Sequence, residues 1–125
     1  MSVLRRAAYA ALAFIYSGCT VMPEISVQEL KVRRDRKDKF VLLDVREPKE
    51  FAIAKIEGST LIPLGDLPTR LHELDKNARL VVHCKSGVRS AKAVKLLREK
   101  GFDAVNLAGG IDAWSELIDP SVPRY

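Results

Sequence analysis

The 125-residue sequence contains only two cysteines, Cys19 and Cys84, and therefore cannot build the disulfide framework of a small secreted domain. No apolar run reaches the roughly 18 residues that cross a membrane. The sequence also lacks metal-cluster spacing, a glycine-rich dinucleotide fingerprint and a nucleotide-binding loop, so we expect neither a bound metal nor a dissociable cofactor. With 47% hydrophobic and 30% charged residues, the composition is that of one soluble globular domain.

The net charge of +5 has a local origin, because six cations crowd the short stretch from Lys31 to Lys39. No aromatic side chains, on which bases would stack, interleave with these charges. The pattern therefore favours the solvated end of a helix and a loop over a nucleic-acid site. Such a basic face would also attract an acidic protein or a small anion by electrostatic steering.

From Pro23 onward, strand and helix patterns alternate, which predicts an α/β fold with a central parallel sheet flanked by helices. Ser26 and Glu29 have the spacing of a capping box at the start of the first helix. We expect helices over residues 27–36, from Pro48, over 66–74, 90–100 and 111–117. Strands are expected over residues 40–44, 61–62, 80–83 and 104–107.

Residues 1–22 form an N-terminal apolar tail that precedes the domain of residues 23–125. Arg5 and Arg6 come before an apolar run that ends in small residues and Cys19, an outline shared with bacterial secretion signals and lipoprotein cleavage boxes. The alternative is an amphipathic helix or the remnant of a linker. We favour the helix or linker and hence a cytoplasmic protein, whereas a signal would make the protein exported or lipid-anchored through Cys19.

A cysteine stands where a predicted buried strand meets a predicted helix, because Cys84 follows the run from Leu80 to His83. A loop opened by Gly87 can turn several backbone N–H groups inward, and the next helix adds the positive end of its dipole. These donors, together with Arg89, would stabilise a thiolate, whereas a cysteine that only packs in a core needs none of them. Cys84 is therefore the candidate nucleophile. The residues that rim its pocket are Lys85, Ser86, Gly87, Val88, Arg89 and Ser90.

The loop from His83 to Ser90 resembles the active-site loop of the rhodanese family, sulfurtransferases that carry a sulfane sulfur as a cysteine persulfide. Leu42–Glu47 resembles the first motif of that family, and Gly109–Trp114 resembles its closing motif. Residues 119–125 resemble in particular the C-terminal rhodanese domain of the adenylyltransferase–sulfurtransferase fusions of molybdopterin and thiamin synthesis. The resemblance covers residues 23–125, without an adenylating domain, and implies the rhodanese-like three-layer α/β fold.

The resemblance places Asp44 beside the active-site loop. There Asp44 would brace the loop, either by accepting hydrogen bonds from loop N–H groups or by pairing with an arginine; alternatively it caps the following helix. Arg46 is a further supporting residue. His83 precedes Cys84 on a strand, so its ring is expected to face away from the thiol and to be structural rather than a catalytic base. Trp114 is expected to pack in the core.

The resemblance implies a sulfurtransferase in which Cys84 takes a sulfane sulfur from thiosulfate or from the persulfide of a cysteine desulfurase. The acceptor is a thiophile, and for the fused relatives it is a ubiquitin-like sulfur carrier protein. A non-catalytic interaction module is one alternative, and a cysteine phosphatase or arsenate reductase is another. The loop is one residue shorter than that of cysteine phosphatases, which disfavours the latter. Lys55 stands where the family usually has His, so no catalytic role is assigned there.

Overall fold

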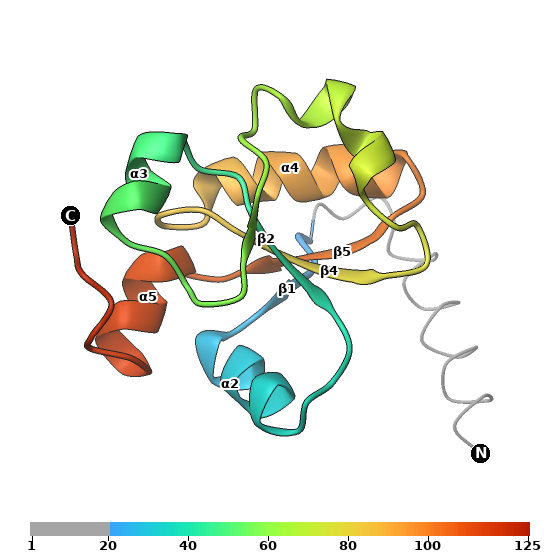
Figure 1. The fold of residues 1–125 in the computed structure, drawn as a ribbon. Coiled ribbons are helices and arrows are strands. Elements are labelled where there is room, and N and C mark those ends of the chain that lie inside the picture. The colour runs from blue at the N-terminus through green and yellow to red at the C-terminus, as the bar shows by residue number, and fades with distance from the viewer. Residues whose placement is uncertain (1–20) are drawn as a thin grey trace, which may run out of the picture.

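The protein is described by a computed structural model that covers residues 21–125; Cys19 and most of the apolar tail lie outside the described residues. In the described part of the chain, five parallel strands form one sheet in the order β1-β5-β4-β2-β3 (Figure 1). The strands are β1 (Glu24–Ile25), β2 (Val41–Asp44), β3 (Thr60–Leu61), β4 (Arg79–His83) and β5 (Asp103–Leu107).

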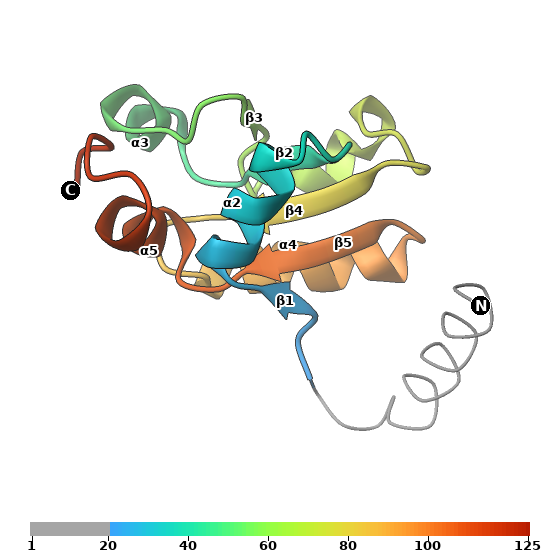
Figure 2. The same ribbon diagram turned by 90° about the horizontal axis from the view of Figure 1, so that it is seen from below.

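Helices cover both faces of this sheet. One face carries α2 (Val27–Asp35) and α5 (Gly110–Leu117), and the other carries α4 (Val88–Glu99) (Figures 1 and 2). The short helix α3 (Pro48–Ile53) follows the carboxyl end of β2. The predicted α/β architecture with a central parallel sheet is confirmed. None of the helices among residues 21–125 has the length and apolar character needed to cross a membrane.

The residues of β4 alternate between the two cores. Leu80, Val82 and Cys84 contact the core under α4, whereas Val81 lies in the core under α2 and α5 with Trp114. This follows from the period of two in a strand, which sends successive side chains to opposite faces. The alternation therefore brings Cys84 to the face on which α4 begins. Trp114 is a core residue, as expected.

The single helix predicted over residues 66–74 is wrong. The segment forms two 3-10 turns, Leu67–Thr69 and Leu71–Glu73. Arg70 lies between them with φ −118° and ψ 14°, which is outside the helical region. Leu67 and Leu71 both pack against the core under α4. Burial of these side chains thus decides the path of the segment against its helical pattern.

Two further differences from the expected elements concern the start of α4 and the presence of β1. Helix α4 begins at Val88 rather than at Ser90, so its first turn belongs to the predicted active-site loop. Strand β1 was not expected, because two residues are too few for a periodic pattern. Ser26 does cap α2 as predicted, since its Oγ accepts a hydrogen bond from the Glu29 N–H group at 3.1 Å.

The basic stretch at the end of α2 has its charges partly paired on the surface. Lys31 pairs with Asp35 at 2.6 Å, and Arg36 pairs with Asp38 at 2.7 Å. Exposed pairs of this kind contribute little to stability. The arrangement is that of a solvated helix end and loop, as the sequence suggests.

Candidate active site

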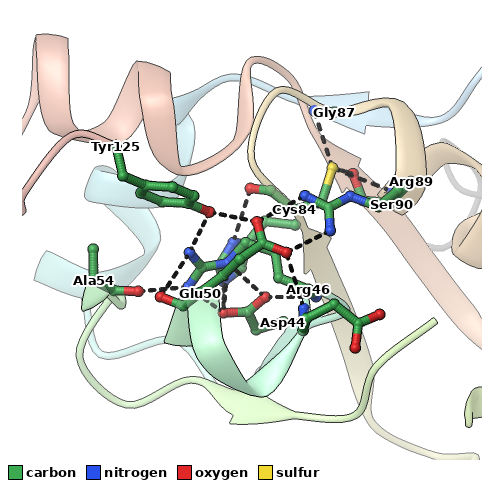
Figure 3. Close-up of polar contacts among 11 residues, drawn as sticks. Asp44, Arg46, Glu50, Ala54, Cys84, Gly87, Arg89, Ser90 and Tyr125 are labelled. Carbon is green, nitrogen blue, oxygen red and sulfur yellow. Dashed lines mark hydrogen bonds and ion pairs between the residues drawn. The ribbon is translucent and has the colours of Figure 1, made fainter. Parts of the chain in front are cut away.

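The predicted loop lies at the carboxyl edge of the sheet, where β4 ends and α4 begins (Figure 3). Cys84 is only 1% exposed, at the base of this loop. Gly87 has φ 111°, a left-handed conformation that residues with a Cβ rarely adopt. The resulting turn directs the N–H groups of Gly87 and Ser90 at Sγ, over 3.1 and 3.4 Å. The backbone thus forms an anion cradle around the sulfur.

These donors set the acidity of the thiol. Burial raises the pKa of Cys84, but hydrogen bonds from the Ser90 hydroxyl and from the N–H groups of Ser90, Gly87 and Ser86 outweigh it. The pKa of Cys84 therefore lies below its ordinary value. The N-terminus of the 12-residue helix α4 adds its positive dipole end at the same point. The arrangement favours the thiolate, which is the nucleophilic form of cysteine.

Ser90 connects the thiol to Asn106 on β5. Its Oγ is 3.3 Å from Sγ and 2.5 Å from Asn106 Oδ1, while Asn106 Nδ2 donates to the Gly87 carbonyl at 3.1 Å. The Ser90 hydroxyl donates to the amide oxygen of Asn106, and in its contact with the thiol either group can be the donor. Sequence reasoning missed Asn106, although a polar residue inside the apolar run 104–107 is a signal for such a contact.

The Arg89 side chain pairs with Glu50 of α3 rather than with the thiolate. Its Nη1 and Nη2 donate to the two carboxylate oxygens over 2.7 and 2.9 Å. Among the described residues, the groups that hydrogen-bond to Sγ are neutral and belong to Ser86, Gly87 and Ser90. The stabilisation of the thiolate that was expected from Arg89 therefore involves no hydrogen bond, and Arg89 acts on Cys84 through space only. Its hydrogen bonds are instead the main cause that lowers the pKa of Glu50 to about 2.

Asp44 and Arg46 form a fully buried ion pair beneath the loop (Figure 3). Arg46 Nη2 donates to Asp44 Oδ2 at 2.7 Å, and its Nε donates to Oδ1 at 3.0 Å. Arg46 also donates to the Ala54 carbonyl and to the Tyr125 hydroxyl, each at 2.7 Å. Asp44 therefore pairs with an arginine, which is one of the roles expected for it. The residue that caps α3 is Glu47. Neither Glu50 nor Tyr125 was singled out from the sequence, because nothing local to them indicates these distant partners.

His83 is buried beside its register partner Asp44. Its Nδ1 lies 3.4 Å from the Cys84 carbonyl oxygen, and Nε2 lies 3.9 Å from Asp44 Oδ2. Within residues 21–125, Nε2 has no hydrogen-bond partner. Burial lowers the pKa of His83 to about 4, against the opposing effect of the Asp44 charge. The imidazole is therefore neutral at physiological pH, as suits a structural residue.

The other loop side chains lie on the rim. Ser86 and Val88 are exposed, and Val88 presents 65% of its surface. Lys85 Nζ pairs with Asp112 at the start of α5 over 3.0 Å, and the Asp112 N–H group donates to the Lys85 carbonyl over 3.0 Å. Helix α5 thereby holds the loop from the other side. In the described part of the chain, no three His, Cys, Asp or Glu side chains gather in a way that could hold a metal ion.

Comparison with known proteins identifies the family. Residues 26–117 match the family described as the Rhodanese-like domain. The chain is 41% identical over 97 residues to YtwF of Bacillus subtilis, named as a sulfurtransferase, and the match covers 78% of this chain and 94% of YtwF. It is 40% identical over 111 residues to MoeZ of Mycobacterium tuberculosis, named as an adenylyltransferase and sulfurtransferase; this match covers 86% of the chain but only 27% of MoeZ.

A similar fold is found in the crystal structure of a rhodanese-like domain protein from Staphylococcus aureus. The TM-score is 0.74 at 36% sequence identity, and the match covers 83% of this chain and 99% of the other. The shared fold, the sequence match and the cysteine loop at the carboxyl edge of the sheet agree. The chain belongs to the rhodanese family of sulfurtransferase-like domains.

Proposed function

We propose that this protein is a sulfurtransferase that carries a sulfane sulfur as a persulfide on Cys84. The observation that carries the proposal is the set of donors around Sγ, namely the N–H groups of Gly87 and Ser90 and the Ser90 hydroxyl. Groups that stabilise negative charge on a thiolate also suit the charged terminal sulfur of a persulfide. The family membership and the sulfurtransferase name of YtwF support the same activity.

The reaction is a double displacement. In the first step the Cys84 thiolate attacks the outer sulfur of the donor, so that a bond from Sγ to that sulfur forms and the donor's own S–S bond breaks. The electron pair leaves with sulfite when thiosulfate is the donor, or with a cysteine thiolate when the donor is the persulfide of a cysteine desulfurase. In the second step an acceptor nucleophile attacks the outer sulfur of the persulfide, and the Cys84 thiolate leaves.

The acceptor is a thiophile such as cyanide, glutathione or another thiol. A ubiquitin-like sulfur carrier protein with an adenylated C-terminal glycine is the protein acceptor that the resemblance to the fused enzymes implies.

Donor and acceptor would meet the side chains at the rim of the loop, which are Lys85, Ser86, Val88 and Arg89. Asp44 and Arg46 support the loop from below. Because Cys84 is buried at the base of the loop, only the reacting sulfur of a substrate needs to reach it, and the rest of the substrate contacts the rim.

Intact mass spectrometry after incubation with thiosulfate tests the proposal. Because Cys19 is a second thiol, the measurement is made on the Cys19→Ser variant and on the same variant with Cys84→Ser. We expect a gain of one sulfur atom, reversed by a reductant, in the first protein and no gain in the second. Circular dichroism checks that both retain the fold. Failure of every sulfur donor to modify Cys84 would support a non-catalytic module, and hydrolysis of a phosphate ester would support a phosphatase.

A further inference from the structure

Both cations of the active-site loop are neutralised by carboxylates that come from outside the loop. Arg89 is held by Glu50 of α3 through two hydrogen bonds of 2.7 and 2.9 Å. Lys85 is held by Asp112 of α5, with Nζ at 3.1 and 3.0 Å from the two carboxylate oxygens. Each formal positive charge on the loop thus has a formal negative charge beside it. The rim offers almost no net charge to an incoming anion.

The C-terminal segment reinforces the first of these pairs. The Tyr125 hydroxyl donates to Glu50 Oε2 at 2.7 Å and accepts from Arg46 Nη1 at 2.7 Å (Figure 3). Glu50 Oε1 also accepts from the Glu47 N–H group at 3.1 Å. With these donors and Arg89, both oxygens of the Glu50 carboxylate are occupied, and its side chain is only 12% exposed. The carboxylate is therefore built into the wall of the site, where it is held by several donors besides Arg89.

The second pair is positioned in a similar way. Asp112 lies in the first turn of α5, and its own N–H group bonds to the Lys85 carbonyl. Lys85 Nζ also lies 4.7 Å from the centroid of the Tyr125 ring, a distance suited to a cation–π contact. One side-chain ion pair and one backbone hydrogen bond thus hold Lys85 beside Asp112. Both loop cations are thus ion-paired, and the side chains of Lys85 and Arg89 remain 36% and 35% exposed.

The sulfur itself has a different environment, because its donors are neutral groups and a helix N-terminus. Such donors suit a single negative charge on the reacting sulfur, whereas a dianion with charge spread over a sulfonate group gains more from unpaired cations at the rim. We infer that this site takes its sulfur from an organic persulfide in preference to inorganic thiosulfate; this inference rests on the sulfur transfer proposed above. An organic persulfide group carries at most one negative charge, which is located on the sulfur. Glu50 and Asp112 are the residues that impose this preference.

The transfer from an organic persulfide balances without a further reagent. The Cys84 thiolate attacks the outer sulfur of R–S–SH, the bond from Sγ to that sulfur forms, and the R–S bond to it breaks. The electron pair leaves with R–S⁻, and the proton stays on the transferred sulfur until the Cys84 persulfide ionises. No charge separates in this exchange, since one thiolate replaces another. The neutral rim therefore does not oppose the reaction.

The experiment compares two donors on matched variants in a Cys19→Ser background. The donors are thiosulfate and the persulfide of N-acetylcysteine methyl ester, whose only ionisable group is the persulfide. The variants Glu50→Gln and Asp112→Asn each remove one negative charge at the rim with little change in shape. Asp103→Asn makes the same change in an exposed residue at the amino end of β5, on the opposite edge of the sheet, and is the control for net charge.

The measured quantity is the second-order rate constant of Cys84 persulfidation, followed by intact mass. The ratio of the thiosulfate rate to the organic persulfide rate is expected to rise about threefold to tenfold in Glu50→Gln and in Asp112→Asn, and to fall again as salt is added. Asp103→Asn is expected to keep the ratio of the parent. An unchanged ratio in both rim variants, with Cys84 still modified, would overturn this inference alone. If neither donor modifies Cys84 in the parent, the sulfurtransferase proposal itself fails.

Discussion

Gly110 allows α5 to approach the active-site loop more closely than any side chain would permit. A Cβ placed there would lie 2.5 Å from the Lys85 carbonyl oxygen and 2.6 Å from that of Cys84. The residue also has φ 58°, in the left-handed region. The close approach lets the Ile111 N–H group donate to the Cys84 carbonyl at 3.0 Å. Gly110→Ala is therefore expected to affect both the stability of the fold and the position of the loop.

The size of the effect follows from two contributions. A left-handed conformation costs an alanine about 1 to 2 kcal/mol relative to glycine. Forcing an extra carbon against two carbonyl oxygens costs a further contribution of about 1 to 3 kcal/mol, because the neighbours are backbone and cannot turn aside. The free energy of unfolding should thus fall by about 2 to 5 kcal/mol in Gly110→Ala, a large part of the stability of a small domain.

Two other glycines separate these contributions. Gly58 has φ 85° but nothing within 4 Å of the position that an alanine Cβ would take, so Gly58→Ala should lose only the conformational cost of about 1 to 2 kcal/mol. Gly65 has neither a positive φ nor a near neighbour, so Gly65→Ala should change stability by no more than about 0.5 kcal/mol. Urea unfolding followed by circular dichroism and by the fluorescence of buried Trp114 measures all three. Equal losses in Gly110→Ala and Gly58→Ala would refute the argument from close approach.

Two further predictions concern the neighbours of Cys84. Ser90→Ala removes a hydrogen bond to Sγ, so the pKa of Cys84 should rise; the pH profile of alkylation by iodoacetamide measures this, and an unshifted profile would contradict the role given to the hydroxyl. His83 has its pKa lowered to about 4, so between about pH 6.5 and 4 the unfolded chain binds a proton that the folded chain does not. The free energy of unfolding should therefore fall as pH drops through this window, and His83→Gln should flatten the decline in urea unfolding while the same change at exposed His72 should not.

The local chemistry of the site was readable from the sequence because its parts are neighbours along the chain. A strand followed by a loop with Gly87 and a helix is enough to predict N–H groups around Cys84. The period of two along β4 likewise separates Cys84 from His83 before any packing is known. The cap at Ser26 follows from spacing in the same way.

Packing overrode local pattern in the segment 66–74. Its apolar spacing suits a helix, but Leu67 and Leu71 pack into the core under α4. Strand β1 shows the converse case, since two residues carry no pattern and become a strand only because β5 offers an edge to pair with.

The electrostatic character of the rim was decided by tertiary structure alone. The sequence determined that Lys85 and Arg89 stand on the loop, and from this Arg89 was expected to help stabilise the thiolate. The fold instead brings Glu50, 39 positions away from Arg89, into a bidentate contact, and brings Tyr125 across 75 positions to hold that carboxylate. Coulombic attraction depends on distance in space, and spacing along the sequence does not show which distant carboxylate lies beside Arg89 in the folded protein. The sequence by itself therefore determined the candidate nucleophile and its cradle, while only the tertiary structure decided which charges surround them.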